Sequence, residues 1–127
     1  MKNTFSILST LALVGIIFFI ATSGKSASES NGNNVSIVDG VQIIEITAKG
    51  GYSPSVTMAK AGMPSVLRVE TNGTYDCSSA LVIPGMDYRE NLTASGTTEI
   101  QIPAKEAGET LEGVCGMGMY DFTIQFE

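Results

Sequence analysis

A strict alternation of apolar and polar residues fills the C-terminal segment YDFTIQFE. Its apolar members Tyr120, Phe122, Ile124 and Phe126 would share one face of a strand, and its polar members would share the other. Successive side chains of a β-strand point to opposite faces, whereas an α-helix would spread the same residues around its circumference. The segment is therefore predicted to be a strand with one buried face.

The same period recurs in earlier segments of the chain. In TTEIQIP, Ile100 and Ile102 fall on one face, and in PSVLRVE Leu67 and Val69 do so. Further strand candidates are VQIIEITAK, SVTMAK, SALVIP and GETLEGVC, separated by turn-forming runs such as GGYSP, ETNGTYD and PGMD. No segment carries an apolar stripe of helical period, and residues 88–94 are expected to form one helical turn at most. About seven short strands spaced by turns predict an all-β, antiparallel sandwich.

The N-terminal part of the chain has a different composition. A lone lysine precedes an apolar, uncharged stretch from about Phe5 to Ala21, which is typical of an export signal or an N-terminal membrane anchor. We predict a signal peptide or anchor at 1–23, a small polar flexible linker at 24–35 and one folded domain at 36–127. Either interpretation of the leader places the domain outside the cytoplasm, in the periplasm or at the cell surface, secreted or held through its N-terminal segment.

The charge of the chain excludes several classes of function. Seven basic residues stand against thirteen acidic ones, and there is no histidine. An acidic chain without a basic cluster is not expected to bind nucleic acid or anionic lipid, so any membrane contact would be made only through the N-terminal segment. Without histidine there is no Ser/His/Asp or Cys/His pair, and neither glycine-rich stretch matches a phosphate-binding motif. The chain is predicted not to be an enzyme.

Two cysteines, Cys77 and Cys115, leave two interpretations open. In an exported domain the default is a single disulfide, which here would close a loop of about 39 residues and add on the order of 3–4 kcal/mol in the chain-entropy model. The surroundings favour a metal instead, because Cys115 lies in CGMGMY and Met86 follows Cys77 in IPGMDY. Thiolate and thioether sulfur are donors that suit Cu(I), and Gly116 and Gly118 would let the backbone fold tightly around one point.

Two other methionines are interpreted as packing residues. Methionine commonly fills irregular gaps in a core. Met58 alternates with Val56 on a predicted strand, and Met63 lies in a turn before Pro64. Both methionines are therefore expected to pack rather than to bind metal.

Several elements recur in a characteristic order. Tyr52-Ser53-Pro54 follows the first strand, Cys77 precedes a strand ending in Ile83-Pro84, and CGMGMY precedes the last strand. Over about residues 41–127 this order resembles the cupredoxin fold, and in particular the small EfeO-type cupredoxin-like domains. The resemblance implies a Greek-key β-sandwich with a metal site at one end, and Tyr52 is interpreted as a packing residue of that fold.

The resemblance also implies a ligand set. Its positions correspond to Cys77, Cys115, Met117 and Met119, with Met86 as a further candidate. Blue-copper proteins use two histidines, which this chain lacks, so Cu(I) is expected rather than a blue Cu(II) site. We expect a copper carrier or buffer that exchanges copper with a donor or acceptor protein. The alternatives are a metal-free structural module with a Cys77–Cys115 disulfide, and an electron-transfer protein with unusual copper ligation.

Overall fold

The structure, a computed structural model, describes residues 34–127, so the predicted leader and nearly all of the predicted linker lie outside the described residues. The described part contains strands and two short 3-10 helices, and none of its helices has the length and hydropathy needed to cross a membrane. In chain order the elements are β1 (Val35–Val38), β2 (Val41–Ala48), β3 (Tyr52–Ser53), β4 (Val56–Ala59), β5 (Ser65–Thr71), η1 (Cys77–Ser79), β6 (Ala80–Ile83), η2 (Pro84–Met86), β7 (Tyr88–Asn91), β8 (Gly96–Ile102), β9 (Thr110–Cys115) and β10 (Asp121–Phe126).

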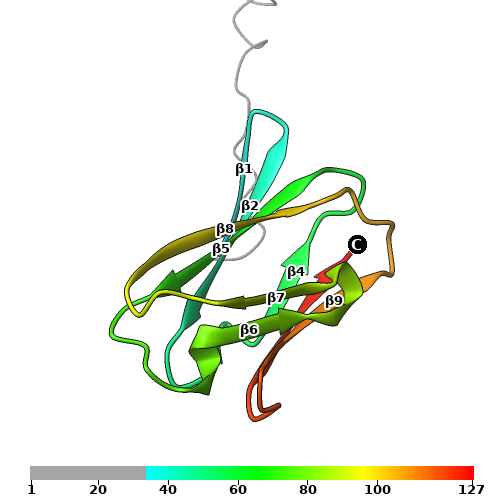
Figure 1. Cartoon of the computed structure of the whole chain (residues 1–127). Coiled ribbons are helices and arrows are strands. Elements are labelled where there is room, and N and C mark those ends of the chain that lie inside the picture. The colour runs from blue at the N-terminus through cyan, green and yellow to red at the C-terminus, as the bar shows by residue number, and fades with distance from the viewer. Residues whose placement is uncertain (1–33) are drawn as a thin grey trace, which may run out of the picture.

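The strands form two five-stranded sheets that face each other as a sandwich (Figure 1). The first sheet has the order β1-β2-β5-β8, with the short β3 pairing beside β2, and the second has the order β4-β10-β9-β6-β7. Two pairings, β2 with β5 and β4 with β10, are parallel, and the remaining pairings are antiparallel. The predicted all-β sandwich is confirmed, and the structure adds the two parallel pairings.

The seven predicted strand segments each contain a strand, and three further strands were not predicted. β1 begins at Val35, which is buried and lies one residue before the predicted start of the domain. β3 has only two residues. β7 occupies Tyr88–Asn91, where a helical turn was expected, and pairs antiparallel with β6. That expectation was wrong because YREN is an edge strand with little apolar signal, and its strand character comes from its partner.

The core lies between the two sheets and follows the predicted alternation. Phe122 and Ile124 are fully buried and Phe126 nearly so, while Tyr120 is half-buried just before β10. The ring of Tyr52 meets that of Phe122 edge to face, with centroids 5.1 Å apart, which is a favourable geometry for an aromatic pair. The interpretation of Tyr52 as a packing residue agrees with its burial.

The expected orientation of Met58 was wrong. Met58 and Val56 are 39% and 55% exposed, whereas Thr57 and Ala59 between and beyond them are buried. The cause is the pairing of β4 with β10, in which Thr57 and Ala59 stand opposite buried residues of β10. Neighbouring residues across a sheet share a face, so Met58 must point outward.

Candidate functional site

Cys77 and Cys115 meet at one end of the sandwich. Cys77 begins η1, immediately before β6, and Cys115 ends β9. β6 pairs with β9 in a register that places Leu81 opposite Cys115, which brings the preceding turn over the end of β9. The two cysteines form a disulfide, with their Cα atoms 5.6 Å apart, inside the usual span for a bridged pair.

The turn that carries Cys77 is held by hydrogen bonds to the first sheet. Asp76 caps η1, and its carboxylate accepts from the hydroxyl and the N–H of Ser78 and from the N–H of Gly50 at 2.8 Å. The bonds from Ser78, and then that from Gly50, hold the pKa of Asp76 below its ordinary value. The Tyr52 hydroxyl, from the same sheet, donates to the Ser78 carbonyl at 3.0 Å. Cys77 therefore stands between Asp76 and Ser78, and both of these residues are hydrogen-bonded to the β2–β3 region of the first sheet.

The loop after Cys115 is equally constrained. The N–H of Cys115 donates to the Tyr120 carbonyl at 2.9 Å, and the N–H of Gly118 donates to the Cys115 carbonyl at 2.8 Å. Gly118 has φ +73°, a conformation that side chains disfavour. The N–H of Gly116 donates to the Ala80 carbonyl at 2.7 Å, and a Cβ on Gly116 would lie 3.3 Å from the Ala80 Cβ. The two glycines thus allow the tight loop and its close approach to the start of β6.

Met117 and Met119 lie in this loop with exposed side chains. They are 78% and 64% exposed, so they do not fill the core. The backbone N–H of Met119 points at the sulfur of Cys115, with a nitrogen–sulfur distance of 3.2 Å. The structure therefore brings Cys77, Cys115, Met117 and Met119 to one end of the domain.

Met86 is not part of this group. It ends η2, which follows the C-terminal end of β6, whereas Cys77 begins η1, which precedes the N-terminal end. Figure 1 shows short helical turns at the two opposite ends of β6. The four residues of β6, at about 3.3 Å each, put roughly 13 Å between the two helices. Met86 packs against the core instead. Met86 and Cys77 therefore stand at opposite ends of β6, and the structure does not bring the further candidate ligand to the end of the domain that holds the two cysteines.

Sequence reasoning did not find the residues that support Cys77. The role of Asp76 could have been predicted from the sequence, because aspartate is a favoured residue at the N-cap of a helix. The role of the Tyr52 hydroxyl carries no such local signal, since Ser78 lies 26 positions away.

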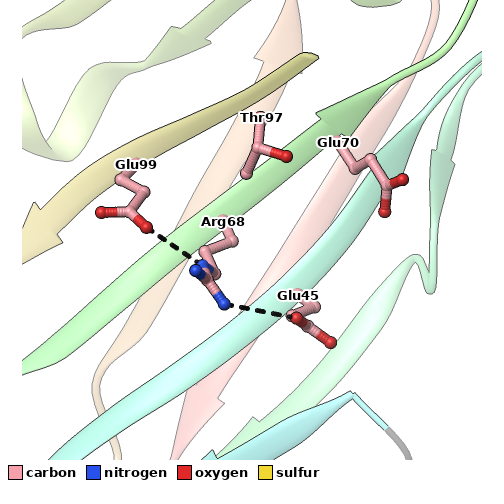
Figure 2. Close-up of a pocket in the computed structure, with 5 residues that line it drawn as sticks. All are labelled: Glu45, Arg68, Glu70, Thr97 and Glu99. Carbon is pink, nitrogen blue, oxygen red and sulfur yellow. Dashed lines mark hydrogen bonds and ion pairs between the residues drawn. The ribbon is translucent and has the colours of Figure 1, made fainter.

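No three side chains of His, Cys, Asp or Glu gather within residues 34–127 in a way that could hold a metal ion. A charged depression lies on the outer face of the first sheet, lined by Glu45, Arg68, Glu70, Thr97 and Glu99 (Figure 2). There the guanidinium of Arg68 lies 3.1 Å from a Glu99 oxygen and 3.8 Å from a Glu45 oxygen. These are exposed cross-strand ion pairs of modest energy, and they account for the cluster without a ligand.

Comparison with protein families matches residues 10–125 to a cupredoxin-like domain. Comparison with curated proteins gave no match.

Several solved structures are similar in fold. The metal-binding domain of the Cu(I)-exporting P-type ATPase CopA of Streptococcus pneumoniae D39, solved with Cu(I), is 22% identical, covers 73% of this chain and 92% of its own, and has a TM-score of 0.64. A copper-binding protein solved by NMR in the apo form is 23% identical over 76% of this chain and 97% of its own, with a TM-score of 0.67. Auracyanin A, a blue copper protein of Chloroflexus aurantiacus, is 15% identical over 69% of this chain and 100% of its own, with a TM-score of 0.51.

Proposed function

The chain belongs to the cupredoxin-like domain family, and from that premise we propose that it is an extracytoplasmic, non-enzymatic protein that binds copper as Cu(I) for carriage or buffering. The observation that carries the proposal is the convergence of four sulfur-bearing residues, from segments 38 positions apart, at one end of the domain. Two solved structures of similar fold are a Cu(I)-loaded metal-binding domain and a copper-binding protein, and this similarity also supports copper binding.

The donor set suits Cu(I). In the reduced protein, Cys77 and Cys115 would supply two thiolates, and the thioether of Met119 or Met117 would complete the site. Soft sulfur donors favour Cu(I), and a site without imidazole has little preference for Cu(II). The place of both methionines supports this role, because they are exposed in the loop that directly follows Cys115 and do not fill the core.

Copper binding requires that the disulfide be reduced, since a bridged pair offers no thiolate. The hydrogen bonds that place the two cysteines do not depend on the bridge. The Cys77 turn is held through Asp76 and Ser78, and the start of β6 is held through Gly116. Reduction is therefore expected to free both sulfurs while leaving them close together.

A competition titration tests the proposal. The full chain is reduced, freed of reductant and titrated anaerobically with Cu(I) against a coloured Cu(I) chelator. Replacing Cys115 by Ala is expected to weaken Cu(I) binding by at least about tenfold, and Met119→Leu and Met117→Leu together by a smaller factor, because thiolates bind more strongly than thioethers. Met58→Leu, an exposed methionine on β4, is the matched control and should bind as the unaltered chain does. An affinity unchanged by Cys115→Ala contradicts the proposal.

The exposed sulfurs also suit exchange with a copper-donating or copper-accepting protein, because a partner could reach the thioethers directly. The leader-like stretch from about Phe5 to Ala21 supports a location outside the cytoplasm. Cell fractionation checks that location, and recovery of the chain in the cytoplasmic fraction would contradict it.

A second candidate function is favoured by the disulfide itself. A metal-free structural module would use the Cys77–Cys115 bridge only for stability. Mass spectrometry of protein taken directly from its own compartment separates the two functions. An oxidised, metal-free pair that resists reduction supports the module, and a copper adduct or a reduced pair supports the carrier. Electron transfer remains a third prediction, tested by the visible charge-transfer band that it requires with Cu(II).

A further inference from the structure

The two cysteines of the disulfide differ in their exposure to solvent. Cys115 is 1% exposed and belongs to the core, where it ends β9. Cys77 is only partly buried and packs against the core from the turn outside it. Reduction of a disulfide begins with attack of a thiolate on one of the two sulfurs, and the rate depends on which sulfur can be reached. Access alone favours attack on Cys77.

A hydrogen bond to the Cys115 sulfur also favours attack on Cys77. The backbone N–H of Met119 is 3.2 Å from the Cys115 sulfur and donates to it. The loop that aims this N–H is fixed by the bonds of Cys115 with Tyr120 and Gly118. A hydrogen bond to the charged form of a group stabilises that form. This hydrogen bond would stabilise the negative charge that gathers on the Cys115 sulfur as it departs, and a leaving thiolate that is stabilised in this way departs faster.

We propose that the Cys77–Cys115 bond is a polarised, reducible disulfide in which Cys77 is the sulfur attacked and Cys115 the thiolate that leaves. A thiolate reductant forms a bond to the Cys77 sulfur, the bond between the two cysteine sulfurs breaks, and Cys115 takes the electron pair. A second reductant thiolate then attacks the reductant sulfur of this mixed disulfide and releases Cys77 as a thiolate. Overall, two reductant thiols are oxidised to one disulfide, and the protein disulfide gains two electrons.

This inference deepens the proposed function, because it describes how the copper site would be opened, and it rests on that function only for its physiological meaning. The site of attack is itself a property of the disulfide and can be measured without any metal. Failure of the copper titration would leave the inference standing, and attack on Cys115 instead of Cys77 would overturn the inference while leaving copper binding to the reduced pair untouched.

The test identifies the sulfur that receives the reductant. The oxidised full chain is treated briefly with reduced glutathione, quenched by acid with rapid alkylation, and digested for peptide mass spectrometry. Glutathione is expected on Cys77, with the alkyl group on Cys115, in at least about tenfold excess over the reverse arrangement. Equal labelling, glutathione mainly on Cys115, or a pair that excess glutathione does not reduce would overturn the proposal.

A conservative variant separates the backbone of Met119 from its side chain. Met119→Leu keeps the N–H that points at Cys115 and removes only the thioether. It should keep the preference for Cys77 within about twofold of the unaltered chain. Loss of the preference in Met119→Leu would overturn the role of the N–H. Met117→Leu and Met119→Leu together are expected to weaken Cu(I) binding, and the doubly substituted chain should keep the preference for Cys77, which separates the thioethers from the backbone N–H.

Discussion

The hydroxyl of Tyr52 donates a hydrogen bond to the carbonyl oxygen of Ser78 at 3.0 Å. Tyr52 belongs to β3 of the first sheet, and Ser78 follows Cys77 in η1, next to the second sheet. This contact therefore ties one sheet to the turn that presents a proposed copper ligand. Because both partners are buried, the bond also contributes to the stability of the fold.

Replacing Tyr52 by Phe is expected to lower the free energy of unfolding by about 0.5–1.5 kcal/mol, because the Ser78 carbonyl loses its donor while the ring is kept. Denaturant unfolding of the oxidised chain measures the change. Tyr75→Phe is the control, since Tyr75 is 87% exposed and its replacement should change stability by less than about 0.5 kcal/mol.

Tyr52→Phe should also change how the stability of the chain depends on pH at alkaline pH. Burial, and then the negative charge of Asp76, raises the pKa of Tyr52 from 10.0 to about 12. Since the unfolded chain releases this proton first, the stability contributed by Tyr52 is complete below pH 10.0 and is lost as the pH rises toward about 12. Tyr52→Phe should reduce that alkaline loss, and an unaltered alkaline limb would contradict the buried phenol.

Replacing Asp76 by Asn tests the dependence of stability on pH at acid pH. Hydrogen bonds from Ser78 and Gly50 hold the pKa of Asp76 below its ordinary value of 3.8. A lowered pKa contributes stability above that value, and the contribution disappears as the pH falls through the folded-state pKa. Asp76→Asn should therefore lower the free energy of unfolding at neutral pH. It should also reduce the loss of that free energy as the pH falls, which denaturant unfolding at a series of pH values measures. Asp121→Asn, on the exposed outer face of β10, should preserve the shape of the curve.

Replacing Gly113 by Ala is expected to destabilise the core by about 1–3 kcal/mol. Gly113 stands opposite Phe122 in the β9–β10 pairing, and a Cβ there would overlap the Phe122 ring. Because Phe122 is fully buried, its ring has no open space to enter. Thermal unfolding measures the loss. Gly85→Ala is the matched control, since its Cβ would make only an ordinary contact with Leu111 at 3.5 Å, and equal losses in both variants would contradict the steric cause.

Replacing Gln42 by Leu is expected to lower the free energy of unfolding by about 1–3 kcal/mol despite the gain in apolar surface. Gln42 is fully buried, donates to the Ser65 hydroxyl at 3.0 Å and accepts from the Lys60 N–H at 2.8 Å. Leucine removes these bonds inside the core. Gln101→Leu changes the same residue type on the exposed face of β8 and should have little effect in chemical denaturation. A stabilised Gln42→Leu chain would show that the network is dispensable.

The strand positions could be predicted where the chain itself carries the pattern. Phe122, Ile124, Ile100 and Leu67 all face the core as their alternation indicates. The side chains of one strand alternate because of the backbone alone, so a single segment reports its two faces. The positions of Cys77 and Cys115 at one end were implied by family resemblance rather than by any local pattern.

Other features of the fold depend on how the strands pair, and they could not be predicted from single segments of sequence. The outward orientation of Met58 comes from the register of β4 with β10, and the strand at Tyr88–Asn91 comes from its pairing with β6. Met86 is separated from Cys77 by the direction of β6. Each of these depends on a partner distant in sequence, and a short window of residues contains no information about that partner.

The chain by itself therefore determined the class of fold and the chemistry of its sulfur residues, because alternation and residue type are local properties. Only the tertiary structure decided that the two cysteines are bridged, how unequally Cys77 and Cys115 are exposed, and that the Met119 N–H points at one of them. These are relations between segments, set by the packing of two sheets against each other and by the loops that close their common end.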